Sequence, residues 1–277
     1  MIRVKNQSIL ASIIIIAFIF PMSANAQHFK GSIGQTHPKI LSYHDHLGLG
    51  KKIEKYLLPI QLGTFLYLEY GIEHHSSKKP ASGPNSLDGY FRNKLRWNRT
   101  QMDNAESASD MLLYGVFLGS LPIIPLLSDN AYVKILRVSL DVLSLNGIIT
   151  DVVKMTVGRQ RPDSFHGTRE TTDDSFRSFF SGHTSTTFAL ATSNALILSD
   201  IYPEKKTMIW VGNLSLAAAT GYLRIAADKH YMSDVICGGI VGYSIARIVH
   251  RKWERNGLKV KFDPMKRDLS INLSLKL

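Results

Sequence analysis

The residues from Arg224 to Asp234 have the types and spacing needed for nucleophilic chemistry beside a cation. If a helix begins near His230, Asp234 lies one turn later on the same face. A carboxylate there holds one imidazole nitrogen and leaves the other as a lone-pair nucleophile. The plainer interpretation is a salt-bridged surface turn. A metal site is the weaker alternative, because no further carboxylates or cysteines cluster here.

A second candidate is the stretch Phe180-Ser181-Gly182-His183-Thr184, which precedes an apolar helical run. Ser181 is a good N-cap residue, and Gly182 lets a ligand approach the backbone closely. The free N–H groups and the positive end of the helix dipole form an anion seat with His183 at its rim. Alone, these residues predict no more than a capped helix start.

Lys154 and Arg161 form a third, basic cluster. On one continuous helix these side chains would lie about 10 Å apart, too far to hold a single phosphate. Gly158 is a good helix terminator and Pro162 prevents the helix from resuming there, so the chain can fold Arg161 back towards Lys154. A basic helix end that complements the helix dipole explains the same cluster without a ligand.

Helices must position these clusters. Lys154 ends one helical segment and His183 starts the next. Arg224 ends the third and His230 starts the fourth, so an up-down antiparallel bundle places all of them at one end. Such a site suits a phosphoryl group, whose equatorial oxygens carry the charge. The predicted fold is all-α, an antiparallel helical bundle with the active site at one end. Its helices are expected over five stretches: 111–127, 134–154, 184–199, 207–223 and 235–246.

The composition indicates a folded protein with anionic partners. The 277 residues carry 33 Lys+Arg against 22 Asp+Glu, a formal charge of +11, and 44% are hydrophobic, which excludes a disordered chain. Cys237 is the single cysteine, so we expect no internal disulfide and no cysteine-built metal site.

The N-terminus has the parts of a secretory signal peptide. Residues 1–26 begin with a basic segment, continue through an apolar run and end in small residues at Ala24-Asn25-Ala26. An uncleaved membrane anchor is the alternative. In either case the remainder leaves the cytoplasm. Nucleic acid is therefore not expected as a partner, whereas phosphorylated small molecules or lipids are.

The remainder divides into three regions. Residues 27–109 form an N-terminal helical and loop region, with an amphipathic helical pattern over 53–73 and a loop over 78–104. Residues 110–253 form the helical core that carries the three clusters. Residues 254–277 form a tail that alternates with period two, which predicts a short C-terminal β-hairpin.

Three groups of residues resemble, in order and internal spacing, the signature motifs of the type 2 phosphatidic acid phosphatase and vanadium haloperoxidase superfamily: Lys154…Arg161-Pro162, Ser181-Gly182-His183 and Arg224…His230…Asp234. The resemblance is to bacterial phosphatase members and covers about residues 110–250. Phe180 stands where the family usually has Pro, and Leu223 stands where it often has Ser. Neither is expected to carry the chemistry.

The resemblance implies a phosphoric ester hydrolase acting on phosphate monoesters or on lipid phosphates and diphosphates. His230 would attack phosphorus to form a phosphohistidine, with Asp234 orienting its ring, and His183 would protonate the leaving alkoxide and then activate water. It implies no cofactor and no metal, because three cations replace the metal. The phosphoryl oxygens would be held by the remaining motif residues: Lys154, Arg161, Ser181, Gly182 and Arg224.

Two other functions stay open. The same clamp binds vanadate, so a vanadate-dependent haloperoxidase is the enzymatic alternative, although the family's haloperoxidases are generally much larger. A non-catalytic protein that binds anionic lipid headgroups is the other alternative. The complete set of expected catalytic residues argues against it.

The helix lengths leave membrane placement open. Residues 111–127 and 207–223 are 17-residue uncharged runs, which as helices would be about 26 Å long against a hydrocarbon core of about 30 Å. Spanning helices would place the basic residues 247–255 in the cytoplasm and the site outside. Asp141 argues against a plain lipid-facing helix. We expect an exported protein, periplasmic or membrane-associated, with its active site facing outside the cytoplasm.

Overall fold

The structure, a computed structural model, describes residues 48–71, 84–127 and 132–255, and all regular elements in these ranges are helical. The all-α prediction is confirmed for this part of the chain. The predicted signal peptide and C-terminal hairpin lie outside it. The α-helices are α2 (Gly48–Leu66), α3 (Ser86–Leu95), α4 (Met102–Leu118), α5 (Ile124–Leu126), α6 (Tyr132–Val157), α7 (Pro162–Phe165), α8 (Gly182–Ile201), α9 (Lys206–Ala226) and α10 (Met232–Arg255). Short π and 3-10 segments join them: η2 (Tyr67–Gly71), η3 (Gly119–Ile123), η4 (Asp173–Phe176) and η5 (Pro203–Lys205).

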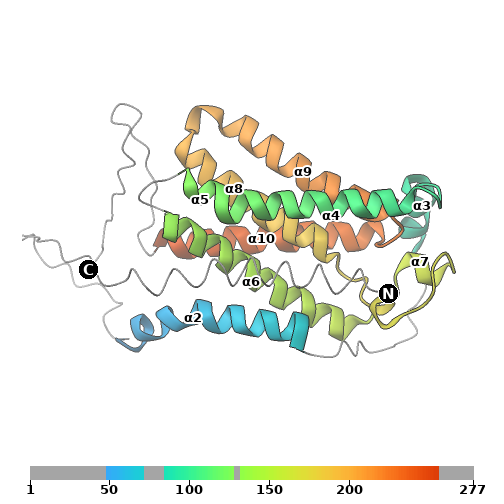
Figure 1. Ribbon diagram of the computed structural model, residues 1–277, viewed down its shortest axis with the longest axis horizontal. Helices are drawn as coiled ribbons and strands as arrows, with labels where there is room; N and C mark the ends of the chain where they lie inside the picture. The colour runs from blue at the N-terminus through green and yellow to red at the C-terminus, as the bar shows by residue number, and fades with distance from the viewer. Residues whose placement is uncertain (1–47, 72–83, 128–131, 256–277) are drawn as a thin grey trace, which may run out of the picture. The chain divides into compact units, whose positions relative to one another are not determined.

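Helix α8 is the centre of the bundle, because it packs against α4, α6, α9 and α10 (Figure 1). Small and β-branched residues cover it on all sides, among them Ala189, Ala191 and Ala195, which are fully or almost fully buried. Helix α10 packs tightly against α8 at Gly242, beside the carbonyl oxygen of Ser185, and at Gly238, where an added Cβ would lie 2.8 Å from the carbonyl oxygen of Ser181. A larger residue there would push α10 away from the end of the bundle that carries the clusters.

The predicted helices are present, and one predicted loop is wrong. The pattern over 53–73 corresponds to α2 and η2, and the segment 134–154 lies inside α6. The loop expected over 78–104 contains α3, which begins after Asn85, whose side chain accepts a hydrogen bond from the Asp88 N–H at 2.8 Å. Basic residues in its last turn complement the helix dipole. The glycines and prolines around α3 favoured the prediction of a loop over this N-cap and charge pattern.

Helix α4 also begins earlier than the predicted boundary between residues 109 and 110. It starts at Met102, so that boundary falls within the helix. Its first turns carry Asp103 and Glu106, which pair with Arg169 at 2.6 and 2.8 Å. These charged residues differ from the apolar run that follows, because they face a polar loop rather than the helical core.

The turn after α6 follows the sequence prediction. Helix α6 ends at Val157, and Gly158 adopts a left-handed φ of 61°, which suits glycine. Arg161 then caps the short helix α7, whose first residue is Pro162. The proline therefore does not merely stop α6; it starts a new helix in a different direction.

By length and composition, two stretches of the described ranges could cross a membrane: Met102–Leu126 and Met232–Glu254. The carboxylate of Asp141 in α6 is buried, accepts a hydrogen bond from Trp253 Nε1 at 3.2 Å, and lies 3.6 Å from Lys252 Nζ. Asp141 therefore faces the bundle interior. It is no obstacle to a lipid-facing outer surface on α6.

Candidate active site

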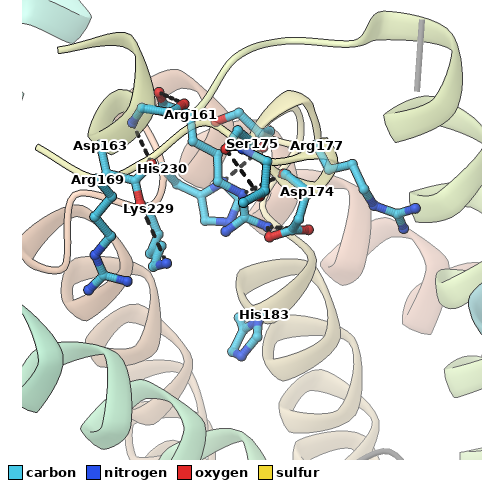
Figure 2. Close-up of polar contacts among 12 residues, drawn as sticks. Arg161, Asp163, Arg169, Asp174, Ser175, Arg177, His183, Lys229 and His230 are labelled. Atoms are coloured by element: carbon cyan, nitrogen blue, oxygen red, sulfur yellow. Dashed lines mark hydrogen bonds and ion pairs between the residues drawn. The ribbon is translucent and has the colours of Figure 1, made fainter. Parts of the chain in front are cut away.

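The predicted cations and histidines meet at one end of the bundle. His230 lies within electrostatic range of Arg161, Arg224, Lys154 and His183. The side chains of His230, Arg161 and Arg224 are buried. We call the space enclosed by these five residues the cup. Figure 2 shows Arg161 and His230 on one side of it and His183 on the facing side.

His230 is held by the backbone. Its Nδ1 atom lies 2.8 Å from the carbonyl oxygen of Ser178. A carbonyl oxygen only accepts hydrogen bonds, so Nδ1 carries the proton and Nε2 keeps its lone pair. Burial lowers the pKa of His230 well below its usual value, and the nearby Arg161 and Arg224 lower it further. The ring is thus neutral, as a nucleophile requires.

Asp234 does not bond directly to the imidazole. Its nearest carboxylate oxygen is 3.7 Å from His230 Nδ1. The carboxylate instead accepts hydrogen bonds from Ser178 Oγ at 2.6 Å and from the Tyr231 N–H at 3.0 Å. Asp234 therefore fixes the Ser178 segment, and the Ser178 carbonyl fixes His230. The direct Asp234–imidazole bond expected from the spacing is replaced by this relay, because α10 begins only at Met232.

Arg159 completes the support behind His230. Its guanidinium pairs with Asp234 and with Asp88 of α3, the latter at 2.6 Å. Asp88 and Asp234 are almost completely buried. One arginine therefore joins the end of α6, helix α3 and the start of α10, and it compensates two buried carboxylates.

The N-terminus of α8 provides the anion seat. Ser181 is buried and caps the helix by accepting from the Thr184 N–H, and its Oγ also accepts from Thr184 Oγ1 at 2.9 Å. The Ser181 hydroxyl proton stays available to a ligand oxygen. At Gly182 an added Cβ would lie 2.9 Å from Lys154 Nζ. Glycine is therefore what lets the lysine ammonium lie against the helix N-terminus.

Arg224 has an unused donor. Its Nη1 donates to Ser109 Oγ at 3.2 Å, whereas its Nε is buried and has no hydrogen-bond partner among the described residues. A buried donor without a partner costs free energy. An oxyanion in the cup would satisfy it.

Arg161 is already paired with a carboxylate. Its Nη2 lies 2.9 Å from Asp174 Oδ2, and its Nε donates to the Asp174 carbonyl at 3.1 Å. Asp174 lies in η4, and Figure 2 shows its carboxylate beside Arg161, on the side facing His183. Withdrawal from bulk water alone would raise the pKa of Asp174, but Arg161, Lys154 and Arg177 outweigh it and lower the pKa to about 2. An anionic group of the protein thus lies against the cations of the cup.

His183 also has a carboxylate partner. Its Nε2 lies 2.8 Å from Asp110 Oδ1 of α4. Burial and the positive charges of Arg224 and Lys154 lower the pKa of His183, while Asp110 acts in the opposite direction.

Several residues of the site carried no sequence signal. Asp110 and Asp88 are more than 70 positions away from the histidine or arginine that each contacts. Arg92 of α3 pairs through two bonds of 2.6 and 2.7 Å with Asp228, which has a left-handed φ of 58° in the turn after α9. The turn that carries His230 is therefore held from outside the three motifs.

The two residues that depart from the family pattern, Phe180 and Leu223, both make apolar contacts. Phe180 is buried next to Phe179 at a ring-centroid distance of 6.1 Å. Leu223 packs against a small cluster that includes Ala105 and Ala226. Both residues contribute packing beside the cup rather than a polar group within it.

Comparison with known proteins finds similarity in the part of the chain that carries the cup. A sequence profile described as the PAP2 superfamily matches residues 138–258. This segment contains the cations, both histidines and the Asp234 relay. This part of the chain is similar to the PAP2 superfamily.

Several curated relatives are similar to a part of the chain. A protein named lipid A 1-phosphatase from Porphyromonas gingivalis is 34% identical over 106 residues, which is 38% of this chain and 21% of that protein. Another lipid A 1-phosphatase, from Rhizobium etli, is 30% identical over 43% of this chain and 50% of its own length. Lipid phosphate phosphatase 2 of Arabidopsis thaliana is 31% identical over 37% of this chain and 44% of its own length. The chain spans half or less of each of these relatives.

Among solved structures, a transmembrane PAP2-type phosphatidylglycerolphosphate phosphatase from Bacillus subtilis aligns with a TM-score of 0.49. It is 20% identical, and the alignment covers 72% of this chain and 97% of that one.

Proposed function

We propose that this protein is a metal-independent phosphatase that hydrolyses lipid phosphates through a phosphohistidine intermediate. One observation carries the proposal: a neutral, backbone-held His230 faces three cations, a helix N-terminus and a second histidine across one cup. This arrangement supplies a nucleophile, an oxyanion clamp and a proton donor for phosphoryl transfer.

In the first step, His230 Nε2 forms a bond to phosphorus as the bond from phosphorus to the leaving oxygen breaks. His183 gives its proton to that oxygen, so the product leaves as an alcohol. The positive charge that forms on His230 is shared with Nδ1–H, which donates a hydrogen bond to the Ser178 carbonyl at 2.8 Å. The Asp234 carboxylate lies 3.7 Å from the same nitrogen.

In the second step, His183 takes a proton from water, whose oxygen attacks the phosphohistidine. The nitrogen–phosphorus bond breaks, inorganic phosphate leaves and both histidines return to their first state.

The phosphoryl oxygens are held during both steps by the charged and polar groups of the cup. Arg224 Nε is the buried donor that lacks a partner among the described residues, and we assign it an equatorial oxygen. Arg161 becomes available when the substrate takes the place of the Asp174 carboxylate. The remaining contacts are assigned to Lys154, Ser181 and Gly182. These groups provide the charge that a metal ion supplies in other phosphatases.

A lipid substrate is favoured by the outer surface of the bundle. Apolar side chains on α4, α9 and α10 are more than half exposed: Met111, Leu118, Met208, Val211, Ile236, Ile240 and Ile248. Such a surface suits acyl chains rather than water. The relatives named lipid A 1-phosphatase and lipid phosphate phosphatase support the same substrate class.

We further propose that the bundle is embedded in a membrane with the cup outside the cytoplasm. Helices α4–α5 and α10 are the candidate spans, and the basic end of α10 would face the cytoplasm. Membranes washed with alkaline carbonate should retain the full chain. Release of the protein by this wash would contradict the embedding.

The activity test is phosphate release from phosphatidic acid, diacylglycerol diphosphate and p-nitrophenyl phosphate, with EDTA present throughout. We expect release from the lipids by the native protein and none by His230→Ala. Activity that survives this substitution would refute the assigned nucleophile. Loss of native activity with EDTA would refute metal independence.

A further inference from the structure

We infer that Asp110 of α4 is the positioning residue of the second histidine: it fixes the tautomer of His183 and keeps its free nitrogen competent for proton transfer. This inference rests on the proposed function, because it assigns the partner of the group that protonates the leaving oxygen. Asp110 lies outside the three motifs and outside the segment that matches the superfamily.

The geometry determines which nitrogen of His183 carries a proton. Asp110 Oδ1 lies 2.8 Å from His183 Nε2. An ionised carboxylate only accepts hydrogen bonds, so Nε2 is the N–H donor. Nδ1 is then the atom that gains and loses the transferable proton. It acts as an acid when protonated and as a base when it is not, so one orientation of the ring serves both steps.

The charges around His183 explain why a carboxylate is needed there. Arg224 from α9, Lys154 from α6 and His230 from the turn before α10 face it, and the first two disfavour its protonated form. Asp110 is the negative group that opposes them, with its oxygen also 3.7 Å from Arg224 Nη1. Without this carboxylate, His183 would hold its proton only at lower pH.

A purely structural role fits the position of Asp110 less well. Its side chain is 28% exposed and that of His183 is 30% exposed, so solvent can reach the pair. Removal of a partly exposed carboxylate costs little stability. The chemistry, rather than the fold, should therefore respond to its substitution.

The test compares Asp110→Asn with Asp103→Asn, a matched carboxylate-to-amide change on the same helix. Asp103 is 86% exposed and pairs with Arg169 rather than with a histidine. The substrates are phosphatidic acid, whose alkoxide needs a proton to leave, and p-nitrophenyl phosphate, whose phenolate does not. The pH dependence of kcat/KM is measured for both.

For Asp110→Asn we expect kcat/KM on phosphatidic acid to fall by about 10- to 100-fold, a part of what a general acid contributes. On p-nitrophenyl phosphate we expect a change of less than about threefold, because this leaving group needs little acid catalysis. The basic limb of the phosphatidic acid profile should move to lower pH. Asp103→Asn should match the native protein on both substrates.

Equal losses on the two substrates with an unmoved basic limb would overturn the inference, as would native-like kinetics of Asp110→Asn. Either result leaves the proposed function standing if the native protein is active and His230→Ala is not. An inactive native protein, or an active His230→Ala variant, would instead remove the proposed function and this inference together.

If Asp110→Asn does not fold, Asp110→Glu carries the comparison, because it keeps the charge. The ratio of kcat/KM on phosphatidic acid to kcat/KM on p-nitrophenyl phosphate should then stay close to the native ratio. The pH of the basic limb should also stay close to native. In Asp110→Glu, a loss of kcat/KM on phosphatidic acid alone, with the basic limb at its native pH, would contradict the electrostatic role of Asp110.

Discussion

The imidazole of His230 and the backbone carbonyl of Ser178 form the contact that orients the nucleophile, at 2.8 Å between Nδ1 and oxygen. Asp234 does not bond to the ring; its carboxylate accepts a hydrogen bond from the Ser178 hydroxyl at 2.6 Å and so holds Ser178 in place. In many histidine-dependent enzymes a carboxylate binds the ring directly and sets its tautomer. Here the main chain does so, and the carboxylate holds the main chain in place.

This arrangement predicts a moderate effect of Asp234→Asn. The Ser178 carbonyl still selects the tautomer, so we expect kcat to fall by about 10- to 100-fold, well short of the roughly 10⁴-fold loss seen where the carboxylate itself sets the tautomer. The measurement is kcat on phosphatidic acid, with thermal unfolding as the control for folding. A loss of 10⁴-fold or more in a folded variant would show that Asp234 acts on the ring directly.

A second prediction concerns stability. Arg159 compensates the buried carboxylates of Asp88 and Asp234, so Arg159→Gln leaves them without their cation. We expect the free energy of unfolding to fall by about 3 kcal/mol. The matched control is Arg169→Gln, whose side chain is 30% exposed, and whose loss should cost less than about 1 kcal/mol. Equal effects in detergent-based unfolding measurements would contradict the role of Arg159.

Asp174 should compete with anionic ligands. Its carboxylate lies 2.9 Å from Arg161 Nη2, and its side chain is 65% exposed, so a phosphoryl group can displace it. We expect Asp174→Asn to lower the inhibition constant of orthovanadate, which mimics the five-coordinate phosphorus, by about 3- to 10-fold, the equivalent of one exposed charge contact.

The control for Asp174 is Asp173→Asn, the neighbouring carboxylate of the same 3-10 turn. It should leave vanadate inhibition unchanged. Weaker inhibition of Asp174→Asn would show that the carboxylate holds Arg161 in position instead of competing with the ligand.

The histidine pKa values predict the pH dependence. The pKa of His230 is lowered, so the nucleophile stays neutral through and above pH 7. The pKa of His183 is also lowered, so its proton-donating form decreases as the pH rises. Because the pKa of His183 is lowered to about 4, kcat/KM on phosphatidic acid should be highest in the acidic range and should already decline as the pH rises from about 4 towards 7. A profile that rises steadily from pH 6 to pH 9 would contradict the assignment of His183 as the acid.

The sequence predicted the bundle and the cup because both depend on local signals. Gly158 and Pro162 mark the turn that brings Arg161 back, and Ser181 marks the start of α8. Antiparallel helices with such ends have few ways to arrange themselves, so the charged ends had to meet.

The supports of the cup could not be predicted in the same way. Asp88, Asp110 and Arg92 approach the motifs from helices far away in the chain, and a single sequence contains no signal for such pairs. Helix α3 was concealed by glycines and prolines nearby. The Ser178 carbonyl was beyond prediction for another reason, because every residue has a carbonyl and only the path of the chain selects one.

The central claim is that His230 carries the phosphoryl group during turnover. The direct measurement is to quench the native protein during hydrolysis of ³²P-labelled phosphatidic acid and to locate the label by peptide mapping. We predict an acid-labile, base-stable phosphohistidine at His230 that is absent from His230→Ala. Rapid phosphate release with no label on this histidine, or label on another residue, would contradict the account.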